Sequence, residues 1–150
     1  MLNAKLKMAL IGLLFLNVAN CLEAAETNQW TQQRLSRLLD QTQGIKPSGD
    51  KVAFISEQFL NTRYKPNTLI GSELRPEQFQ IRLDAVDCLT YLEYVEAMRR
   101  ASSVTDFIEQ LKQVRYQSGK IDYQSRKHFF SNWLDDPRRI QDVTREVGIK

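Results

Sequence analysis

The sequence predicts a mostly helical α+β domain that follows an N-terminal leader. Three observations predict it: the first 25 residues carry a basic and then strongly apolar stretch, most later segments repeat apolar residues every three or four positions, and one short segment alternates apolar with polar residues. A chain of 150 residues is long enough for one such domain, and we expect it to span residues 26–150.

The leader has the pattern of a signal peptide over residues 1–25. Lys5 and Lys7 precede the apolar stretch 8–19, which is too short to span a bilayer as a permanent helix. We therefore expect a periplasmic or secreted protein. An alternative is a lipoprotein anchored at Cys21, and only that alternative would place the chain at a membrane.

The charge and the cysteine content limit the kinds of partner that we expect for this chain. The chain carries a formal charge of +3, and removal of Lys5, Lys7 and Glu23 with the leader would take away one net positive charge. No basic run with interleaved aromatic residues occurs, so we expect no nucleic-acid partner. If Cys21 leaves with the leader, Cys88 has no cysteine to pair with in an oxidising compartment, which is unusual.

The first half of the domain is expected to contain two helices, a loop and a strand. Helices are predicted over 27–43 and 48–60, where apolar residues recur at helical spacing. The segment 61–78 contains two prolines and a glycine and is expected to be a loop. FQIRL, residues 79–83, alternates apolar and polar residues as a half-buried strand does.

The second half opens with DAVDCLTYLEYVEAMRR, residues 84–100, which predicts a helix. Asp87 is a good N-cap and would place Cys88 at the first helical position. The apolar stripe of this helix is expected to consist of Cys88, Tyr91, Leu92, Val95 and Met98.

A second helix is expected after Ser103 or Thr105, followed by a turn at Ser118 and Gly119. A short aromatic helix is predicted over 122–137. The remaining residues are ambiguous between helix and strand.

Cys88 admits three interpretations: a small buried core residue, half of a disulfide, or a nucleophile. At a helix start, the unpaired N–H groups and the positive end of the helix dipole favour a thiolate, which suits a nucleophile. His128 is the only histidine in the chain and is a candidate base for that thiol, or else a structural or binding residue. No cluster of cysteines and histidines has zinc spacing, so we expect no metal.

Three stretches resemble one known family. VDCLTYLEYVEAM is similar to the aspartate–cysteine signature of the N-acetylmuramoyl-L-alanine amidase-like family of bacterial cell-wall hydrolases, within the NlpC-type, papain-fold cysteine hydrolases. Residues 55–71 and 121–134 resemble two further blocks of that family in the same order. The resemblance covers roughly residues 50–147.

The resemblance implies roles for particular residues. Cys88 would be the nucleophile, and Tyr64, Asp87, Arg126 and His128 would contact substrate. The family's histidine motif, aspartate–x–x–histidine–valine–glycine, does not follow His128. We therefore expect the mostly helical N-terminal half of a papain-like (NlpC-type) cysteine hydrolase domain.

The function that the resemblance implies is hydrolysis of the amide between N-acetylmuramic acid and L-alanine in peptidoglycan fragments, the muropeptides, without cofactor or metal. Two alternatives stay open. One is an inactive muropeptide-binding module that lacks the catalytic histidine. The other is a small thiol protein of the export pathway, which would be expected to carry a C-x-x-C motif or a second mature cysteine.

Overall fold

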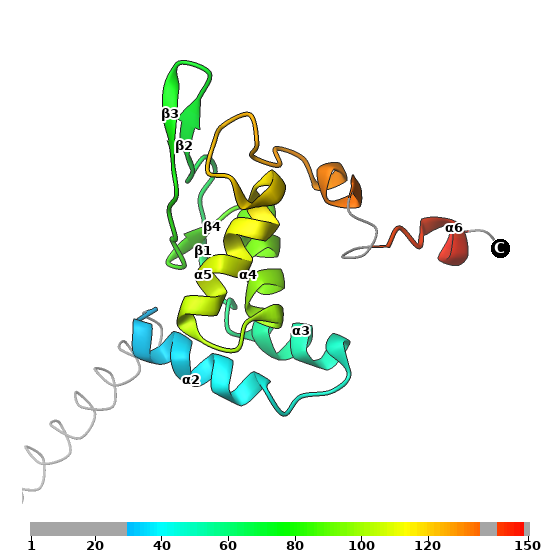
Figure 1. Cartoon of the computed structure of the whole chain (residues 1–150). Coiled ribbons are helices and arrows are strands. Elements are labelled where there is room, and N and C mark those ends of the chain that lie inside the picture. Colours follow the sequence, from blue (N-terminus) through cyan, green and yellow to red (C-terminus); the bar gives the residue numbers. More distant parts are fainter. Residues whose placement is uncertain (1–29, 136–140, 149–150) are drawn as a thin grey trace, which may run out of the picture. The chain divides into compact units, whose positions relative to one another are not determined.

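The computed structural model describes residues 30–135 and 141–148 (Figure 1). The expected signal peptide, residues 1–25, and the candidate lipidation residue Cys21 lie outside the described residues. Residues from Gln32 onward form the second of two units of the chain, and all the elements below belong to this second unit. They make a helix-rich α+β arrangement, as the sequence predicts. No helix in the described part of the chain is long and apolar enough to cross a membrane.

Two helices open the second unit, as expected. Helix α2 (Gln32–Thr42) buries Leu35, Leu38 and Leu39 on one face, and α3 (Ser48–Glu57) buries Ile55. Phe59 follows α3 in a turn and is buried against the tyrosine rings of α4. The predicted helical spacing therefore identified the core face of α2, whereas in α3 only Ile55 is buried and Val52, one turn before it, is exposed.

The helices α4 (Cys88–Arg100) and α5 (Val104–Arg115) form the centre of the unit and pack side by side (Figure 1). A buried ion pair joins them, in which Arg115 Nε donates to Glu93 Oε2 at 2.8 Å. Burial raises the pKa of the Glu93 carboxyl, although Arg115 acts in the opposite direction. Burying two charges is costly, so the pair fixes how α4 and α5 meet more than it adds net stability.

The apolar stripe predicted for α4 is partly wrong. Cys88 and Leu92 are exposed, whereas Thr90, Glu93, Tyr94 and Ala97 face the core. A hydrophobic pattern misses this face because it contains the charged residue Glu93. Burial of Glu93 depends on its ion pair with Arg115, which lies 22 residues away in the sequence.

The segment predicted as a loop contains three short strands. Strand β1 (Arg63–Tyr64) pairs in parallel with β4 (Ala85–Val86), and β2 (Ile70–Ser72) pairs antiparallel with β3 (Arg75–Gln78). The strand residues are mostly exposed, so the sequence shows no apolar alternation that could have revealed them.

The strand predicted for FQIRL is wrong. Residues 79–83 carry no regular secondary structure, and Ile81 is exposed. Side chains from the two central helices bind this backbone instead of a neighbouring strand: Arg115 donates to the Gln80 carbonyl at 2.7 Å, and the Arg82 N–H donates to the Tyr94 hydroxyl at 2.9 Å. The alternating pattern therefore marks an extended segment held by side chains.

The aromatic helix predicted over 122–137 is also wrong for most of its length. After the turn η1 (Gln117–Gly119), the chain is irregular until the short 3₁₀ helix η2 (Phe130–Asp135). The irregular segment hydrogen-bonds back to the end of α5, where the Lys127 N–H donates to Arg115 O and the Gln117 N–H donates to Ser125 O. These long-range bonds use groups that a helix would pair locally. A single helical turn, α6 (Thr144–Val147), follows.

Candidate active site

The first turn of α4 places Cys88 as the sequence predicts. Asp87 is the N-cap, and its Oδ1 accepts from the Thr90 N–H at 2.8 Å. The Thr90 hydroxyl in turn accepts from the Asp87 N–H at 2.9 Å, which completes a capping box. Because Asp87 is the N-cap, Cys88 stands at the first helical position.

Cys88 is a free and exposed cysteine, so its interpretation as a small core residue is wrong. Its own N–H and that of Leu89 make no hydrogen bond with the described residues, as expected for the first turn of a helix. Two backbone donors and a thiol therefore stand together at one helix end.

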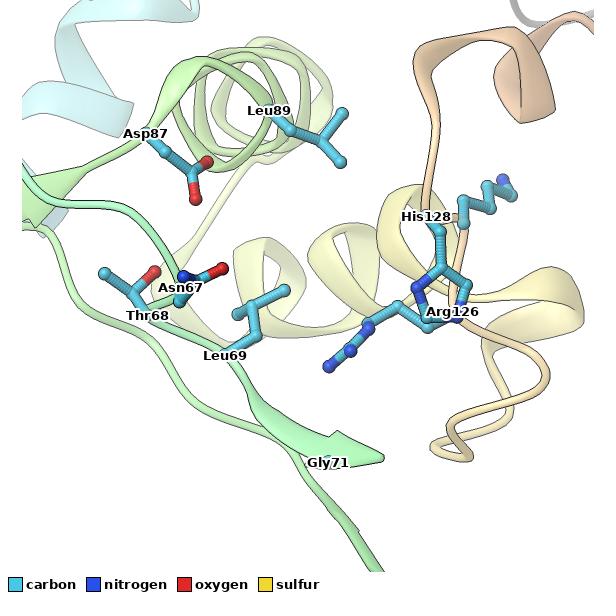
Figure 2. Close-up of a pocket in the computed structure, with 9 residues that line it drawn as sticks. Asn67, Thr68, Leu69, Gly71, Asp87, Leu89, Arg126 and His128 are labelled. Carbon is cyan, nitrogen blue, oxygen red and sulfur yellow. The ribbon is translucent and has the colours of Figure 1, made fainter. Parts of the chain in front are cut away.

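A pocket of about 310 Å³ lies beside this helix start (Figure 2). Three stretches of the chain meet around it: strand β2 with the residues just before it, the start of α4, and the segment after α5. The lining residues are Asn67, Thr68, Leu69, Gly71, Asp87, Leu89, Arg126, Lys127 and His128. Figure 2 shows Arg126 and His128 across the pocket from Asp87 and Thr68.

Arg126 is held from two sides. Its Nη1 donates to both carboxylate oxygens of Glu77, at 3.1 and 3.0 Å, and its guanidinium lies 4.9 Å from the centre of the Tyr123 ring. Its backbone forms an antiparallel bridge with Tyr116 at the end of α5. The side chain is therefore fixed where it enters the pocket.

His128 is bound to the same tyrosine. Its Nε2 lies 2.9 Å from the Tyr123 carbonyl oxygen, and the two rings pack edge to face with centres 4.6 Å apart. Because a carbonyl only accepts, Nε2 carries the hydrogen in this contact, which leaves Nδ1 of a neutral ring as an acceptor. The ring itself is exposed.

The sequence identified part of this site. Asp87, Arg126 and His128 line one pocket. Cys88 does not line it, although its chain neighbours Asp87 and Leu89 do. Tyr64 does not line the pocket; it is exposed on β1, paired with Val86 just before the cap.

Several lining residues escaped the sequence reading. They are Asn67, Thr68, Leu69, Gly71, Leu89 and Lys127. The first four belong to the segment expected to be a loop. The sequence signal for a defined backbone path here was the residue types asparagine at 67 and glycine at 71, which tolerate the positive φ that both adopt in the structure.

No group of three or more histidine, cysteine, aspartate or glutamate side chains that could hold a metal ion occurs in residues 30–135 and 141–148. The chemistry available in this part of the chain is that of a thiol, backbone donors, a guanidinium and an imidazole.

Comparison with models of protein families identifies the family of this chain. The model of the AmiA-like family, described as N-acetylmuramoyl-L-alanine amidase-like, matches residues 54–150, which include every residue of the pocket. The chain belongs to this family. Among proteins with curated descriptions, none matches it.

Solved structures agree with the family. Two crystal structures of an N-acetylmuramoyl-L-alanine amidase from Bacteroides uniformis align at 34% and 32% identity, with TM-scores of 0.57 and 0.59. They cover 65% and 69% of this chain but 43% and 46% of the amidase. A protein from Legionella pneumophila aligns at 31% identity with a TM-score of 0.64, over 75% of this chain and 40% of its own. The chain thus spans less than half the length of each of these structures.

Proposed function

We propose that this chain carries the nucleophile of a cysteine-type N-acetylmuramoyl-L-alanine amidase, and that the nucleophile is Cys88. The observation that supports this most is the position of Cys88, which is exposed at the capped start of α4 beside a pocket lined by residues of all three family-like stretches. The substrate is a peptidoglycan fragment, as the names of the family and of the Bacteroides uniformis structures suggest.

In the proposed reaction, the Cys88 sulfur attacks the carbonyl carbon of the N-acetylmuramoyl group. The thiol proton passes to a base and then to the leaving nitrogen of L-alanine as the C–N bond breaks, and water later hydrolyses the thioester. The backbone N–H groups of Cys88 and Leu89, which make no hydrogen bond with the described residues, are the donors that stabilise the oxyanion. Arg126, His128 and Asp87 contact the substrate, and Tyr64 contributes from β1.

A second candidate function is a muropeptide-binding module. Among the described residues, Cys88 makes no hydrogen bond to a base, and the only histidine of the chain is engaged by Tyr123. Thiol catalysis needs a base within hydrogen-bond reach, so this observation favours binding over turnover for the chain itself.

Two further proposals concern context. We propose that the unit is part of a papain-like, NlpC-type domain. We also propose that residues 1–25 are a signal peptide that sends the protein to the periplasm or outside the cell. Mass spectrometry of periplasmic material should give an N-terminus between residues 22 and 26, whereas a diacylglycerol adduct on Cys21 would replace this with the lipoprotein reading.

The test of function is turnover of an anhydro-muropeptide, followed by chromatography of the released peptide. The variants are Cys88→Ala and His128→Ala. If His128 is the base, both variants lose turnover to the same extent, because residues that act as one unit are not additive. If His128 only contacts substrate, its loss mainly weakens binding. Binding without turnover by the unmodified chain would leave the binding module as the function of this chain.

A further inference from the structure

We propose that Glu77, which does not line the pocket, decides which chemical group the pocket accepts. It positions Arg126 and cancels its charge, so that the pocket selects an uncharged amide of the muropeptide over a carboxylate. This inference rests on the proposed function in so far as it takes the pocket to be the substrate site.

The carboxylate of Glu77 is almost fully buried behind the pocket wall. Its side chain is 1% exposed, and that of Arg126 is 12% exposed. Besides Arg126, Tyr116 donates its hydroxyl hydrogen to Glu77 Oε1 at 2.8 Å. Burial and this hydrogen bond raise the pKa of Tyr116, so the phenol stays protonated and remains a donor. Glu77 is thereby fixed from β3, from the end of α5 and from the segment that carries Arg126.

Gly71 makes room for this carboxylate. A Cβ atom at this position would lie 2.0 Å from Glu77 Oε2, and the φ of Gly71 is +150°. A side chain at residue 71 would therefore have to displace Glu77 and would strain the backbone. The pocket wall at Gly71 is bare backbone with the Glu77 carboxylate directly behind it.

The charge of Arg126 is offset, but its donors are not used up. Only Nη1 binds Glu77, and Nε and Nη2 make no hydrogen bond with the described residues. Of the other charged lining residues, Asp87 is negative, and the Lys127 ammonium donates to the Gln113 carbonyl at 3.3 Å. A carboxylate entering here would meet a guanidinium that already has a carboxylate partner, whereas an amide carbonyl needs only a donor.

Thr68 supplies a second polar group that an amide can satisfy. Its residue is 7% exposed and lines the pocket, and its hydroxyl is buried without a hydrogen-bond partner among the described residues. A hydroxyl can both donate and accept, and an amide offers both a carbonyl and an N–H. An amide can thus satisfy Thr68 and Arg126 together.

The experiment compares two ligands that differ in one group: N-acetylmuramoyl-L-alanyl-D-glutamate and the same compound with its α-carboxylate converted to the amide. Affinities are measured by calorimetry in the Cys88→Ala chain, which removes turnover. Chemical-shift changes at Thr68 and Arg126 report where each ligand binds. We expect the amide to bind about tenfold more tightly than the carboxylate.

Glu77→Gln keeps the shape of the side chain but frees the charge of Arg126. It should shift the preference toward the carboxylate by about tenfold and make carboxylate binding weaken with added salt. Tyr116→Phe is the matched control, because it loosens Glu77 without changing any charge and should leave the preference as it is. A merely structural role for Glu77 would lower both affinities alike.

Equal affinity for the two ligands, or an unchanged preference in Glu77→Gln, would overturn the inference, and so would the absence of binding by both ligands. The proposed function is decided separately, by turnover of anhydro-muropeptide with Cys88 intact. Turnover together with equal affinities would therefore reject the role of Glu77 and keep the amidase.

Discussion

Removal of the cap of α4 tests whether Cys88 stands where the structure places it. Asp87→Ala deletes the acceptor of the Thr90 N–H and the partner of the Thr90 hydroxyl, each at 2.8 Å. Loss of an N-cap costs about 1 kcal/mol, and loss of a negative charge at a helix start costs about 0.3–1 kcal/mol more. We expect the free energy of unfolding to fall by about 1.3–2 kcal/mol.

Two variants separate these contributions. Asp87→Asn keeps a capping side chain and should lose only the charge effect, about 0.3–1 kcal/mol. Ser103→Ala removes the matching cap of α5, where the Ser103 hydroxyl accepts from the Asp106 N–H at 3.1 Å, and should cost about 1 kcal/mol without affecting α4.

Urea denaturation followed by circular dichroism gives the free energies, and amide hydrogen exchange identifies the helix that is affected. Exchange at Thr90 should accelerate in Asp87→Ala and stay unchanged in Ser103→Ala. A cost below about 0.5 kcal/mol for Asp87→Ala, with Thr90 exchange unchanged, would refute the capping box and with it the position of Cys88.

Three other predictions concern the core, the pocket and the thiol. Glu93→Ala should lower the free energy of unfolding by about 3–5 kcal/mol in urea denaturation, because it leaves Arg115 buried without its carboxylate partner. Glu93→Leu combined with Arg115→Met should regain most of this loss. A loss under about 1 kcal/mol for Glu93→Ala would mean that water reaches the pair. Gly71→Ala should displace Glu77 and weaken muropeptide binding in an NMR titration. Gly49→Ala is the control and should not weaken binding, because a Cβ there meets nothing within 4 Å. Equal affinities of the two variants would contradict the close approach of Gly71 to Glu77. Iodoacetamide should label exposed Cys88 in the native chain, and labelling only after denaturation would contradict its exposure.

The sequence predicted the start of α4 because the interactions that make it are local. The cap Asp87 and its partner Thr90 are three residues apart, and aspartate is a residue type that favours the N-cap position. The same holds for Ser103 at the start of α5. Helical spacing also identified the buried faces of α2 and α5, since each packs apolar side chains at intervals of one turn.

The pocket could not be predicted in the same way because long-range pairs build it. Glu77 and Arg126 are 49 residues apart, and Glu77 lies in a polar segment with no apolar pattern. The extended segment 79–83 is held by Arg115 and Tyr94 rather than by a strand, and such side-chain contacts leave no periodic signal. The family-like stretches contain Arg126 and His128 but not Glu77, which binds Arg126.

The central claim is that Cys88 is the nucleophile, and the most direct measurement is the mass of the chain during reaction. The chain is mixed with excess anhydro-muropeptide, quenched in acid within seconds and examined intact and after digestion. We predict a thioester adduct with the mass of the N-acetylmuramoyl-containing acyl group, located on Cys88 and absent from Cys88→Ala. Peptide release that continues in Cys88→Ala without any adduct would contradict the account.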